Sequence, residues 1–359
     1  MTGTCYIVVN ALPPHFGWLT RPDGLRAAQL AQQAREVFST VRFVLFLERF
    51  NRLQAERRNA VLALARDDTI IIASAEFETF SSRIAPATFV FTNTDFAEEA
   101  GFAEQRHRIV YDITQLRALE VAQEGGGPDQ VTIATDIHQQ MLSIADRTFI
   151  NSRALAERSI TARLNRQSPV VDHAPDRHAV AARRACLIAG EAAPQRGDPG
   201  AMLAALTEHL RGAPETQALV IMPPPVPEAP HAMDYGALRL MANVTLLSRL
   251  SSVNDAEVLA LGYGYVEWAP LAPTGPCTTS WRVLQAIAAG MPVLHQAGTG
   301  LDEYFSEFPG ICLTGAITAA DIAAFSERAL RGEFDNSVAR ACRDMAEWRS
   351  DRTLFAGLA

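Results

Sequence analysis

Lysine is absent from this sequence of 359 residues, so arginine and histidine carry all of its side-chain positive charge. Any cationic contact to a phosphate must therefore come from a guanidinium or an imidazole group. Acidic residues outnumber basic ones, and the formal net charge is -8. This balance argues against a general nucleic-acid partner, because such proteins need a basic surface to release counterions from the phosphates.

Cysteine is scarce, and no two of the five cysteines form a CxxC pair. They are scattered over the chain, at Cys5, Cys186, Cys277, Cys312 and Cys342. An odd number of isolated thiols argues against a disulfide framework and against a zinc site. It fits a protein that works in the reducing cytoplasm.

Long apolar runs are missing as well, since none approaches the roughly 20 residues that cross a bilayer. The first ten residues lack the basic segment of a signal peptide and are typical of a buried strand. No GxGxxG pattern follows the first expected strand of either half. Its absence argues against a dinucleotide-dependent oxidoreductase, in which those glycines let the backbone approach the pyrophosphate.

A chain of this length suits two domains of roughly 150 to 180 residues better than a single core. Apolar strands alternate with helical stretches in both halves, which predicts parallel sheets covered by helices. The expected strands are 6–10, 41–47, 68–73, 88–92 and 108–111, then 185–189, 217–222, 244–247, 263–268, 292–295 and 310–313. The main expected helices are 24–38, the stretch from 136 that precedes a strand ending near 151, and 199–210, 281–289, 321–331 and 337–348.

The alternation pauses at the proline-containing stretch 169–176, which we interpret as a short strand and an interdomain linker. The sequence therefore predicts an N-terminal α/β domain over residues 1–172 and a second over 173–336. The remaining residues, 337–359, are expected to form a C-terminal helix that packs back on the first domain.

The segment 275–294 carries the strongest chemical signal. Thr278, Thr279 and Ser280 are good N-cap residues, Gly290 suits the end of a helix, and a proline begins the following strand. The segment is therefore expected to run from a loop through a short helix to a strand. Free amides at the start of such a helix attract an anion with about 0.3–1 kcal/mol, helped by the helix dipole.

Arg282 lies in the first turn of this helix, where the dipole disfavours a cation. An anion docked beside it would explain its presence, because a charge-assisted hydrogen bond contributes about 1.5–3 kcal/mol. Gln285 lies one turn further along the same face, where it can bind a ribose hydroxyl next to the phosphates. The structural alternative is an ordinary helix–strand unit of a doubly wound sheet.

The run 282–293 resembles the donor-site helix of GT-B glycosyltransferases, including the glycosyltransferase family 4-like group. That group carries two glutamates here, at the positions where this chain has Cys277 and Gln285. The segment is more similar to the xanthan glucuronosyltransferase type, in which a cation contacts the diphosphate and a glutamine the ribose. Segments 24–35, 138–152 and 170–176 also resemble parts of these enzymes.

The resemblance implies two Rossmann-like doubly wound domains that face each other across a cleft. It implies transfer of a sugar from a nucleoside diphosphate sugar, with UDP or GDP as the nucleotide, to a carbohydrate or lipid-linked glycan. No cofactor is expected, and no metal, because the sequence contains no Asp-x-Asp motif. The implied donor-binding residues are Thr278, Thr279, Ser280, Arg282 and Gln285.

Three residues are candidates for the catalytic step. His15 lies in the loop after the first strand, where GT-B enzymes bring the N-terminal domain to the sugar, or it is a plain surface histidine. Asp112 follows a strand and is either the base for an acceptor hydroxyl or a turn cap, and the xanthan-type pattern places the catalytic aspartate at Gln115 instead. Glu267 ends the strand before the donor loop and either faces the sugar or pairs with an arginine.

Other positions carry weaker signals. Asp95 is a second strand-end carboxylate that is more typical of a turn, and residues 298–303 form either a sugar-facing loop or a tight turn. Cys277 is interpreted as a packed thiol. Four arginines are expected to line the helix after Ser152, as a solvated face or as a patch that holds an anionic lipid acceptor near a membrane: Arg153, Arg158, Arg163 and Arg166.

Together with the isolated cysteines, the resemblance thus implies a cytoplasmic glycosyltransferase of polysaccharide biosynthesis, with peripheral contact to the inner face of the membrane if the arginine patch holds a lipid. Two alternatives stay open. A non-catalytic binding protein of the GT-B shape is favoured by Cys277 and by the undecided base. A nucleotide-sugar epimerase of the same fold would convert its donor without an acceptor.

Overall fold

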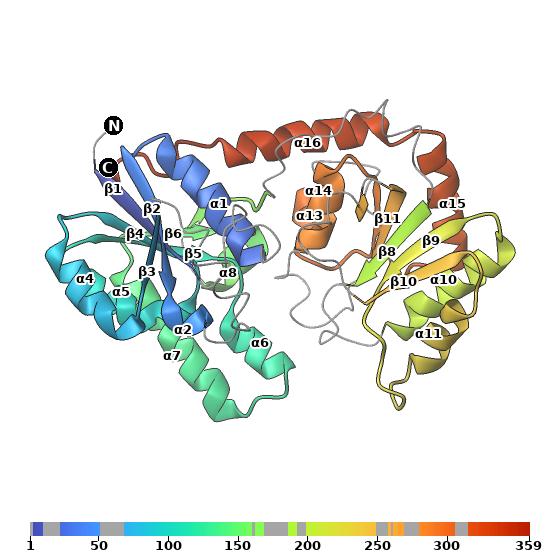
Figure 1. The fold of residues 1–359 in the computed structure, drawn as a ribbon, viewed down its shortest axis with the longest axis horizontal. Coiled ribbons are helices and arrows are strands. Elements are labelled where there is room, and N and C mark those ends of the chain that lie inside the picture. Colours follow the sequence, from blue (N-terminus) through green and yellow to red (C-terminus); the bar gives the residue numbers. More distant parts are fainter. Residues whose placement is uncertain are drawn as a thin grey trace. The chain divides into compact units, whose positions relative to one another are not determined.

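The computed structural model describes residues 3–9, 22–50, 68–159, 162–168, 186–191, 199–248, 258–259, 261–268, 280–305 and 315–359. The chain divides into two compact units. Unit 1 comprises residues 1–170 together with 346–359, and unit 2 comprises residues 171–345. Each unit is built around one parallel sheet (Figure 1).

Unit 1 holds a seven-stranded parallel sheet in the order β3-β2-β1-β4-β5-β6-β7. The chain starts in the middle of this sheet, builds outwards to β3, and then crosses over to β4 and builds towards the other edge. The strands are β1 (Thr4–Val8), β2 (Thr40–Phe46), β3 (Thr69–Ile72), β4 (Thr88–Phe91), β5 (Arg108–Ile113), β6 (Arg147–Ile150) and β7 (Arg163–Leu164).

Both faces of the central strands are buried, which explains why they are almost wholly apolar. On β1, Cys5 and Ile7 point into a core that also contains Leu30 and Phe355. Tyr6 points to the other face, where its ring stacks on Phe89 with a centroid distance of 4.9 Å. The first core is therefore closed by the C-terminal residues of the chain as well as by α1.

The helices of unit 1 cover both faces of its sheet (Figure 1). The pair α6 and α7 packs together and extends beyond the sheet. The helices are α1 (Pro22–Arg35), α2 (Leu47–Phe50), α4 (Phe77–Arg83), α5 (Ala97–Ala103), α6 (Arg117–Gln123), α7 (Pro128–Ile144) and α8 (Arg153–Ser159), with 3-10 turns η2 (Ser74–Glu76) and η3 (Thr94–Phe96).

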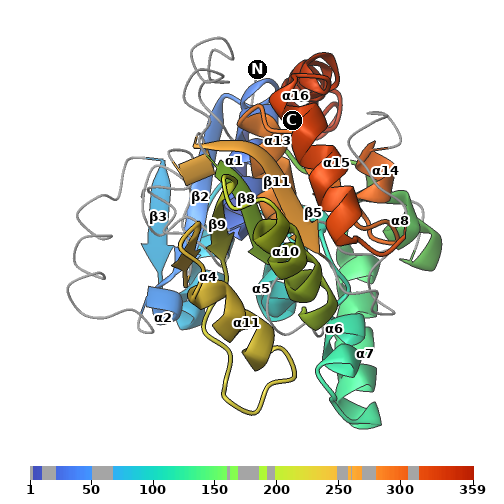
Figure 2. The same ribbon diagram turned by 90° about the vertical axis from the view of Figure 1, so that its right-hand side faces the viewer.

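Unit 2 repeats the same plan with five parallel strands in the order β10-β9-β8-β11-β12. Its strands are β8 (Cys186–Glu191), β9 (Gln217–Ile221), β10 (Val244–Leu247), β11 (Gly262–Trp268) and β12 (Val293–His295). Figures 1 and 2 show α10, α11 and α15 on one side of this sheet and α13 and α14 on the other. The helices are α10 (Gly200–Gly212), α11 (Ala232–Arg239), α13 (Trp281–Ala288), α14 (Asp302–Phe305), α15 (Ala319–Leu330) and α16 (Asp335–Arg349), the last of which runs on into unit 1.

A close approach between β8 and β11 explains one glycine of unit 2. A methyl group on Gly190 would lie 2.2 Å from the hydroxyl oxygen of Tyr265 on the neighbouring strand. Any larger residue would therefore displace a fully buried tyrosine from the point where the order of strands reverses.

The two doubly wound α/β units confirm the expected fold class. The expected strands from 6–10 to 292–295 match observed strands to within a few residues at each end. The strand expected at 310–313 and the linker strand at 169–176 lie outside the described residues. No helix in the described part of the chain is long and apolar enough to cross a bilayer.

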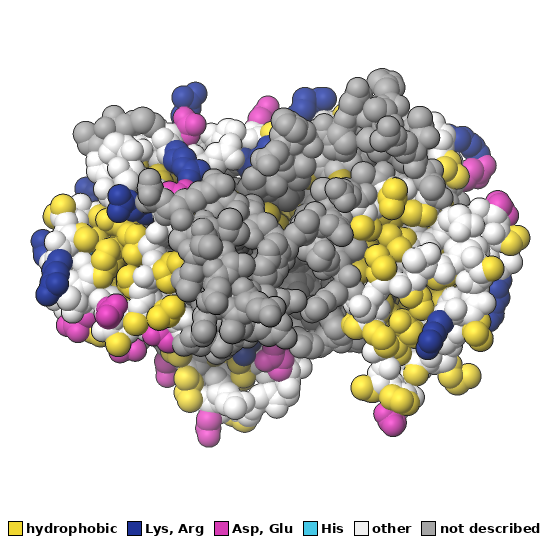
Figure 3. All heavy atoms as spheres, viewed as in Figure 1, with side chains coloured by type: hydrophobic (Ala, Val, Ile, Leu, Met, Phe, Trp, Pro, Cys, Tyr) yellow, Lys and Arg dark blue, Asp and Glu magenta, His cyan; other side chains and the backbone are white. Residues whose placement is uncertain are grey.

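The expected row of four arginines on the helix after Ser152 is wrong. Helix α8 ends at Ser159, and Arg163 belongs instead to the edge strand β7, opposite Phe149 of β6. Arg166 is buried at 7% exposure, so it adds nothing to a surface patch. On the face drawn in Figure 3, the arginine side chains of the described residues lie singly or in small groups.

Candidate functional site

The carboxyl edge of the second sheet brings two ionisable residues together. Glu267 near the end of β11 is the direct neighbour of His295 at the end of β12 in the parallel register. Both side chains are fully buried, and the Glu267 Oε2 to His295 Nδ1 distance is 3.6 Å. In open α/β sheets this edge, next to the point where strand order reverses, is where ligands bind.

The other oxygen of Glu267 accepts a hydrogen bond from the hydroxyl of Ser280. On the far side of the pair, His295 Nε2 lies 2.8 Å from Thr299 Oγ1. A chain of four polar side chains, of which only Ser280 is partly exposed, thus runs from the start of α13 to the turn before α14. Glu267 therefore pairs with a histidine and a serine, and neither partner is the arginine that was considered.

Ser280 is the N-cap of α13. Its side-chain oxygen accepts the backbone N–H of Val283 at 3.3 Å, while its own hydrogen goes to Glu267. One hydroxyl therefore fixes both the first turn of the helix and the carboxylate beneath it.

The end of α13 confirms the expected role of Gly290. This glycine has a φ of 80°, the left-handed conformation that a side chain disfavours. Its N–H bonds to Ile287 O at 2.8 Å, and the N–H of Met291 bonds to Ala286 O at 2.9 Å. This pair of bonds is the Schellman motif, which ends the helix cleanly before β12.

Between these two ends α13 has one buried apolar face and one partly exposed polar face. Val283, Leu284 and Ile287 are fully buried. Arg282 and Gln285 lie on the half-exposed face, and the guanidinium Nη1 of Arg282 donates to Gln285 Oε1 at 3.3 Å. The two residues predicted to bind phosphate and ribose are therefore adjacent and orient one another, next to the capped helix start.

The loop 298–303 is a tight turn before α14. Gly298 takes a φ of 100° and its N–H bonds to Asp302 Oδ2 at 2.6 Å. The N–H of Leu301 bonds to Thr299 Oγ1 at 3.2 Å. Thr299 thus joins this turn to the Glu267–His295 pair.

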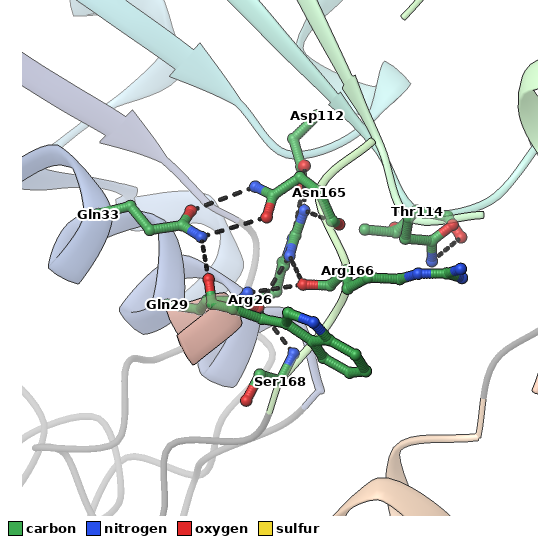
Figure 4. A network of polar contacts seen from close by, with 10 residues as sticks. Arg26, Gln29, Gln33, Asp112, Thr114, Asn165, Arg166 and Ser168 are labelled. Atoms are coloured by element: carbon green, nitrogen blue, oxygen red, sulfur yellow. Dashed lines mark hydrogen bonds and ion pairs between the residues drawn. The ribbon is translucent and has the colours of Figure 1, made fainter. Parts of the chain in front are cut away.

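Asp112 in unit 1 lies in a different environment from the one expected of a base. Its side chain is fully buried at the end of β5, and both carboxylate oxygens accept hydrogen bonds from Arg26, at 2.9 and 2.7 Å (Figure 4). Arg26 is itself only 1% exposed and also donates to the backbone oxygens of Asn165 and Arg166. A carboxylate bound in this way is a structural partner of a buried cation.

Two glutamines on the same face of α1 complete this network. Gln29 accepts from the N–H of Ser168 and donates to Arg166 O, and Gln33 exchanges two hydrogen bonds with the side chain of Asn165 (Figure 4). Together they tie α1 to residues 165–168. The sequence signal was a polar stripe at helical spacing, 26, 29 and 33, on a helix that is otherwise apolar on its packing side.

Unit 1 also contains two cavities near the carboxyl edge of its sheet. The smaller, of about 240 Å³, lies at the ends of β4 and β5 and is lined by polar groups that include Asn93, Thr114 and Gln115. The larger, of about 820 Å³, lies between η3 and the pair α6–α7. Thr94, Asp95 and Arg117 line both, so the two cavities adjoin. Asp95, unlike Asp112, is an exposed carboxylate at this edge.

Several predicted site residues lie outside the described residues: His15, Cys277, Thr278 and Thr279. Their assignments stay predictions. Of the predicted donor residues, the structure brings Ser280, Arg282 and Gln285 together at the start of α13. It adds His295, which the sequence did not single out because only the strand register shows that it faces Glu267, and it links Thr299 of the loop 298–303 to this pair.

No family model and no curated protein sequence matches the chain. Solved structures nevertheless resemble it over almost its whole length. HepE from Anabaena, crystallised with UDP, is 12% identical with a TM-score of 0.63, and the match covers 98% of this chain and 97% of that one.

Two further matches are enzymes named for nucleotide-sugar or sugar-phosphate chemistry. Sucrose-phosphate synthase from Thermosynechococcus elongatus is 12% identical with a TM-score of 0.60, covering 99% of this chain and 98% of that one. A UDP-N-acetylglucosamine 2-epimerase is 12% identical with a TM-score of 0.60, covering 99% and 95%. At such low identity the structural similarity shows the fold alone. This chain has the GT-B fold, built from two Rossmann-like domains.

Proposed function

We propose that this chain is a glycosyltransferase that takes its sugar from a nucleoside diphosphate sugar bound to unit 2. The observation that carries the proposal is the start of α13. There a helix N-terminus, a half-exposed Arg282 and an adjacent Gln285 meet at the carboxyl edge of a Rossmann-like sheet. Structural neighbours crystallised with UDP or UDP-glucose support this proposal.

The chemistry follows from the charges. The departing nucleoside diphosphate gains negative charge as the bond to the sugar breaks. Amides at the start of α13 and the guanidinium of Arg282 would stabilise that charge, while Gln285 binds a ribose hydroxyl. Thr278 and Thr279 belong to the same proposed donor site. No metal ion takes part in the proposed reaction.

The three candidates for the catalytic step have different roles in this proposal. Glu267 and Ser280 position the helix start, since Glu267 is fully buried beneath it. Asp112 is fully buried and both of its oxygens accept hydrogen bonds from Arg26, so the proposal gives it a structural role. His15 stays the proposed proton acceptor, with a carbohydrate or lipid-linked glycan as the proposed acceptor.

Binding of UDP and GDP, measured by isothermal titration calorimetry, tests the donor site. Arg282→Ala should weaken diphosphate binding by about 1.5–3 kcal/mol, because one charge-assisted hydrogen bond is lost. Arg239→Ala, in the last turn of α11, is the matched control and should bind as the parent protein does. Equal affinity of the parent and Arg282→Ala proteins would overturn the proposed site.

An epimerase is the second candidate, because epimerase structures match the chain as fully as glycosyltransferase structures do. The two activities differ in their need for an acceptor. NMR of a panel of UDP- and GDP-sugars, each incubated with the protein alone, would show a new sugar stereoisomer for an epimerase. A glycosyltransferase would leave the sugar unchanged or release free nucleotide by slow hydrolysis. Binding with neither outcome, across a panel of acceptors, would favour a non-catalytic protein.

A further inference from the structure

The two adjoining cavities of unit 1 differ in the chemistry of their walls. The smaller is bounded by hydroxyl, amide and carboxylate side chains at the ends of β4 and β5. The larger has an apolar wall formed by Ala97, Val121, Ile133, Ala134 and Ile137, which face one another from η3–α5, α6 and α7. A ligand that occupies both would need a polar end and an apolar end. The larger cavity, at about 820 Å³, is within the range of small-molecule sites.

Ile133 is the most exposed residue of the apolar wall. It lies on the projecting helix α7 with 59% of its surface exposed, although it is a large hydrophobic residue. Figure 3 shows hydrophobic and acidic side chains side by side on the projection formed by α6 and α7. Ile133 thus continues the apolar wall of the larger cavity to the exposed surface of α7.

The charge of the cavities is acidic. Among the described residues, the acidic side chains that line them are Asp23, Asp95, Glu98, Asp112, Glu120 and Glu124, against a single cation, Arg117. Asp112 is neutralised by Arg26. The remaining carboxylates still exceed the one guanidinium.

The charge of Arg117 is offset by two neighbouring glutamates. Its Nη1 donates to Glu120 at 3.2 Å and its Nη2 to Glu124 at 3.4 Å, so two carboxylates bracket the guanidinium. A phosphate group entering here would meet a net negative wall. An ammonium group would meet the opposite, favourable potential.

We propose that the joined cavities bind the acceptor, and that this acceptor is an amphiphile whose polar end carries an amine and no phosphate. Its ammonium group lies by Asp95, and its apolar part lies between α6 and α7 against Ile133. Naming the ligand as the acceptor rests on the proposed glycosyltransferase function. The chemistry of the ligand rests on the cavities alone. A lipid-linked acceptor with a phosphate or diphosphate head group is thereby disfavoured.

The test uses the full chain and three ligands that share one tail: octyl glucoside, its 2-amino-2-deoxy analogue, and its 6-phosphate. Each is titrated below its micelle concentration, without nucleotide, and followed by calorimetry. We expect the amino compound to bind roughly ten-fold more tightly than octyl glucoside, and the phosphate compound more weakly than either. Equal or tighter binding of the phosphate compound, or binding of none of the three, would overturn the proposal.

Variants assign the effect to these walls. Asp95→Asn combined with Glu98→Gln should remove most of the preference for the amino compound over octyl glucoside. Ile133→Ser should weaken the amino and neutral ligands by the same factor. Glu36→Gln, an exposed carboxylate at the end of α1 and away from the cavities, is the matched control. Loss of the amine preference in the control would contradict the assignment.

The result is independent of the donor site. If Arg282→Ala leaves UDP and GDP binding unchanged while the amino compound still binds, the proposed function fails and the cavity assignment stands. If the nucleotides bind as proposed and the amine preference is absent, only the cavity assignment fails.

Discussion

The hydroxyl group of Ser280 joins the start of α13 to the buried carboxylate of Glu267. It accepts from the N–H of Val283 and donates to Glu267, so its one hydrogen atom is committed within the protein. Glu267 in turn lies beside His295. The buried carboxylate of Glu267 therefore anchors the helix start to which we assign the diphosphate.

Loss of the Ser280 hydroxyl should cost more than loss of an ordinary cap. Ser280→Ala removes a cap worth about 0.5–2 kcal/mol and leaves a buried carboxylate oxygen without its donor, at a further cost of about 1–3 kcal/mol. Thr318→Ala is the matched control, because Thr318 caps α15 through Asp321 at an exposed position.

Urea unfolding measures both costs, and calorimetry with UDP measures the functional effect. We expect only Ser280→Ala to weaken nucleotide binding, and Ser280→Thr, which keeps the hydroxyl, to restore it. Equal losses of stability in the two alanine variants would show that Glu267 does not depend on Ser280.

Removal of one partner of the Arg26–Asp112 pair should destabilise unit 1 strongly. Asp112→Ala leaves a buried guanidinium without its counter-charge, and such a change costs about 3–5 kcal/mol. The double variant Arg26→Met with Asp112→Ala should recover part of this loss, because no buried charge is left unpaired. Thermal and urea unfolding of the two single variants and the double variant give the coupling energy.

This cycle also decides between the structural and the catalytic interpretation of Asp112. A structural pair gives a large coupling energy and a double variant that regains stability. A single variant Asp112→Asn that keeps full stability and loses turnover would instead restore the aspartate as a base.

Which features could be predicted from the sequence depended on how far apart the interacting residues lie along the chain. The cap at Ser280, the end at Gly290 and the polar face of Arg282 and Gln285 are all within one helix, so their pattern was readable. Arg26 and Asp112 are 86 residues apart, and Glu267 meets His295 only through the strand register. No local pattern could show either pair.

Acid should weaken the fold through three buried histidines. Burial lowers the pKa values of His107, His138 and His209 below the ordinary 6.5, with smaller opposing contributions from the Ser81 carbonyl at His107 and from Glu215 at His209. Below pH 6.5 these histidines bind protons in the unfolded chain but not in the folded chain. The free energy of unfolding therefore decreases as the pH falls. Between its folded-state and ordinary pKa values each histidine contributes a slope of up to about 1.4 kcal/mol per pH unit.

His107 offers a clear check, because its protonation state is fixed by its neighbours. Its Nδ1 accepts the N–H of Ala87 at 3.1 Å, and its Nε2 lies 2.8 Å from Ser81 O, so the neutral ring has one bond of each kind. Urea unfolding at pH 7.5, 6.5 and 5.5 should show a smaller loss of stability in His107→Gln than in the parent protein. A parent protein with the same free energy of unfolding at all three values would contradict this account.

Phe355 should be among the most costly residues to truncate in unit 1. Its ring packs edge-to-face on Phe149 at 5.2 Å and on Phe38 at 6.0 Å between centroids, and it is fully buried. Phe355→Ala should cost about 3–5 kcal/mol, as for other buried aromatic residues. Arg352→Ala, exposed three residues earlier, serves as the control and should leave the midpoint of urea unfolding unchanged.

The backbone of the same segment is held by arginines. Arg147 donates to the carbonyl oxygens of Leu354 at 2.7 Å and Ala356 at 3.0 Å, and Arg108 to that of Gly357 at 2.7 Å. The side chain of Thr88 adds a bond to Leu358 O at 3.0 Å. Residues 354–358 are thus an integral layer of unit 1, although they follow the whole of unit 2 in the sequence.

That order has a consequence for biosynthesis. The ribosome makes most of unit 1 first, then all of unit 2, and only then the residues that close the first core. At roughly 5–20 residues per second, the nascent first unit waits on the order of ten seconds or more with that surface uncovered. Unit 2 can finish folding before the unit that precedes it, and during that interval the open face of α1 and β1 is the part of the nascent chain that a chaperone would be expected to cover.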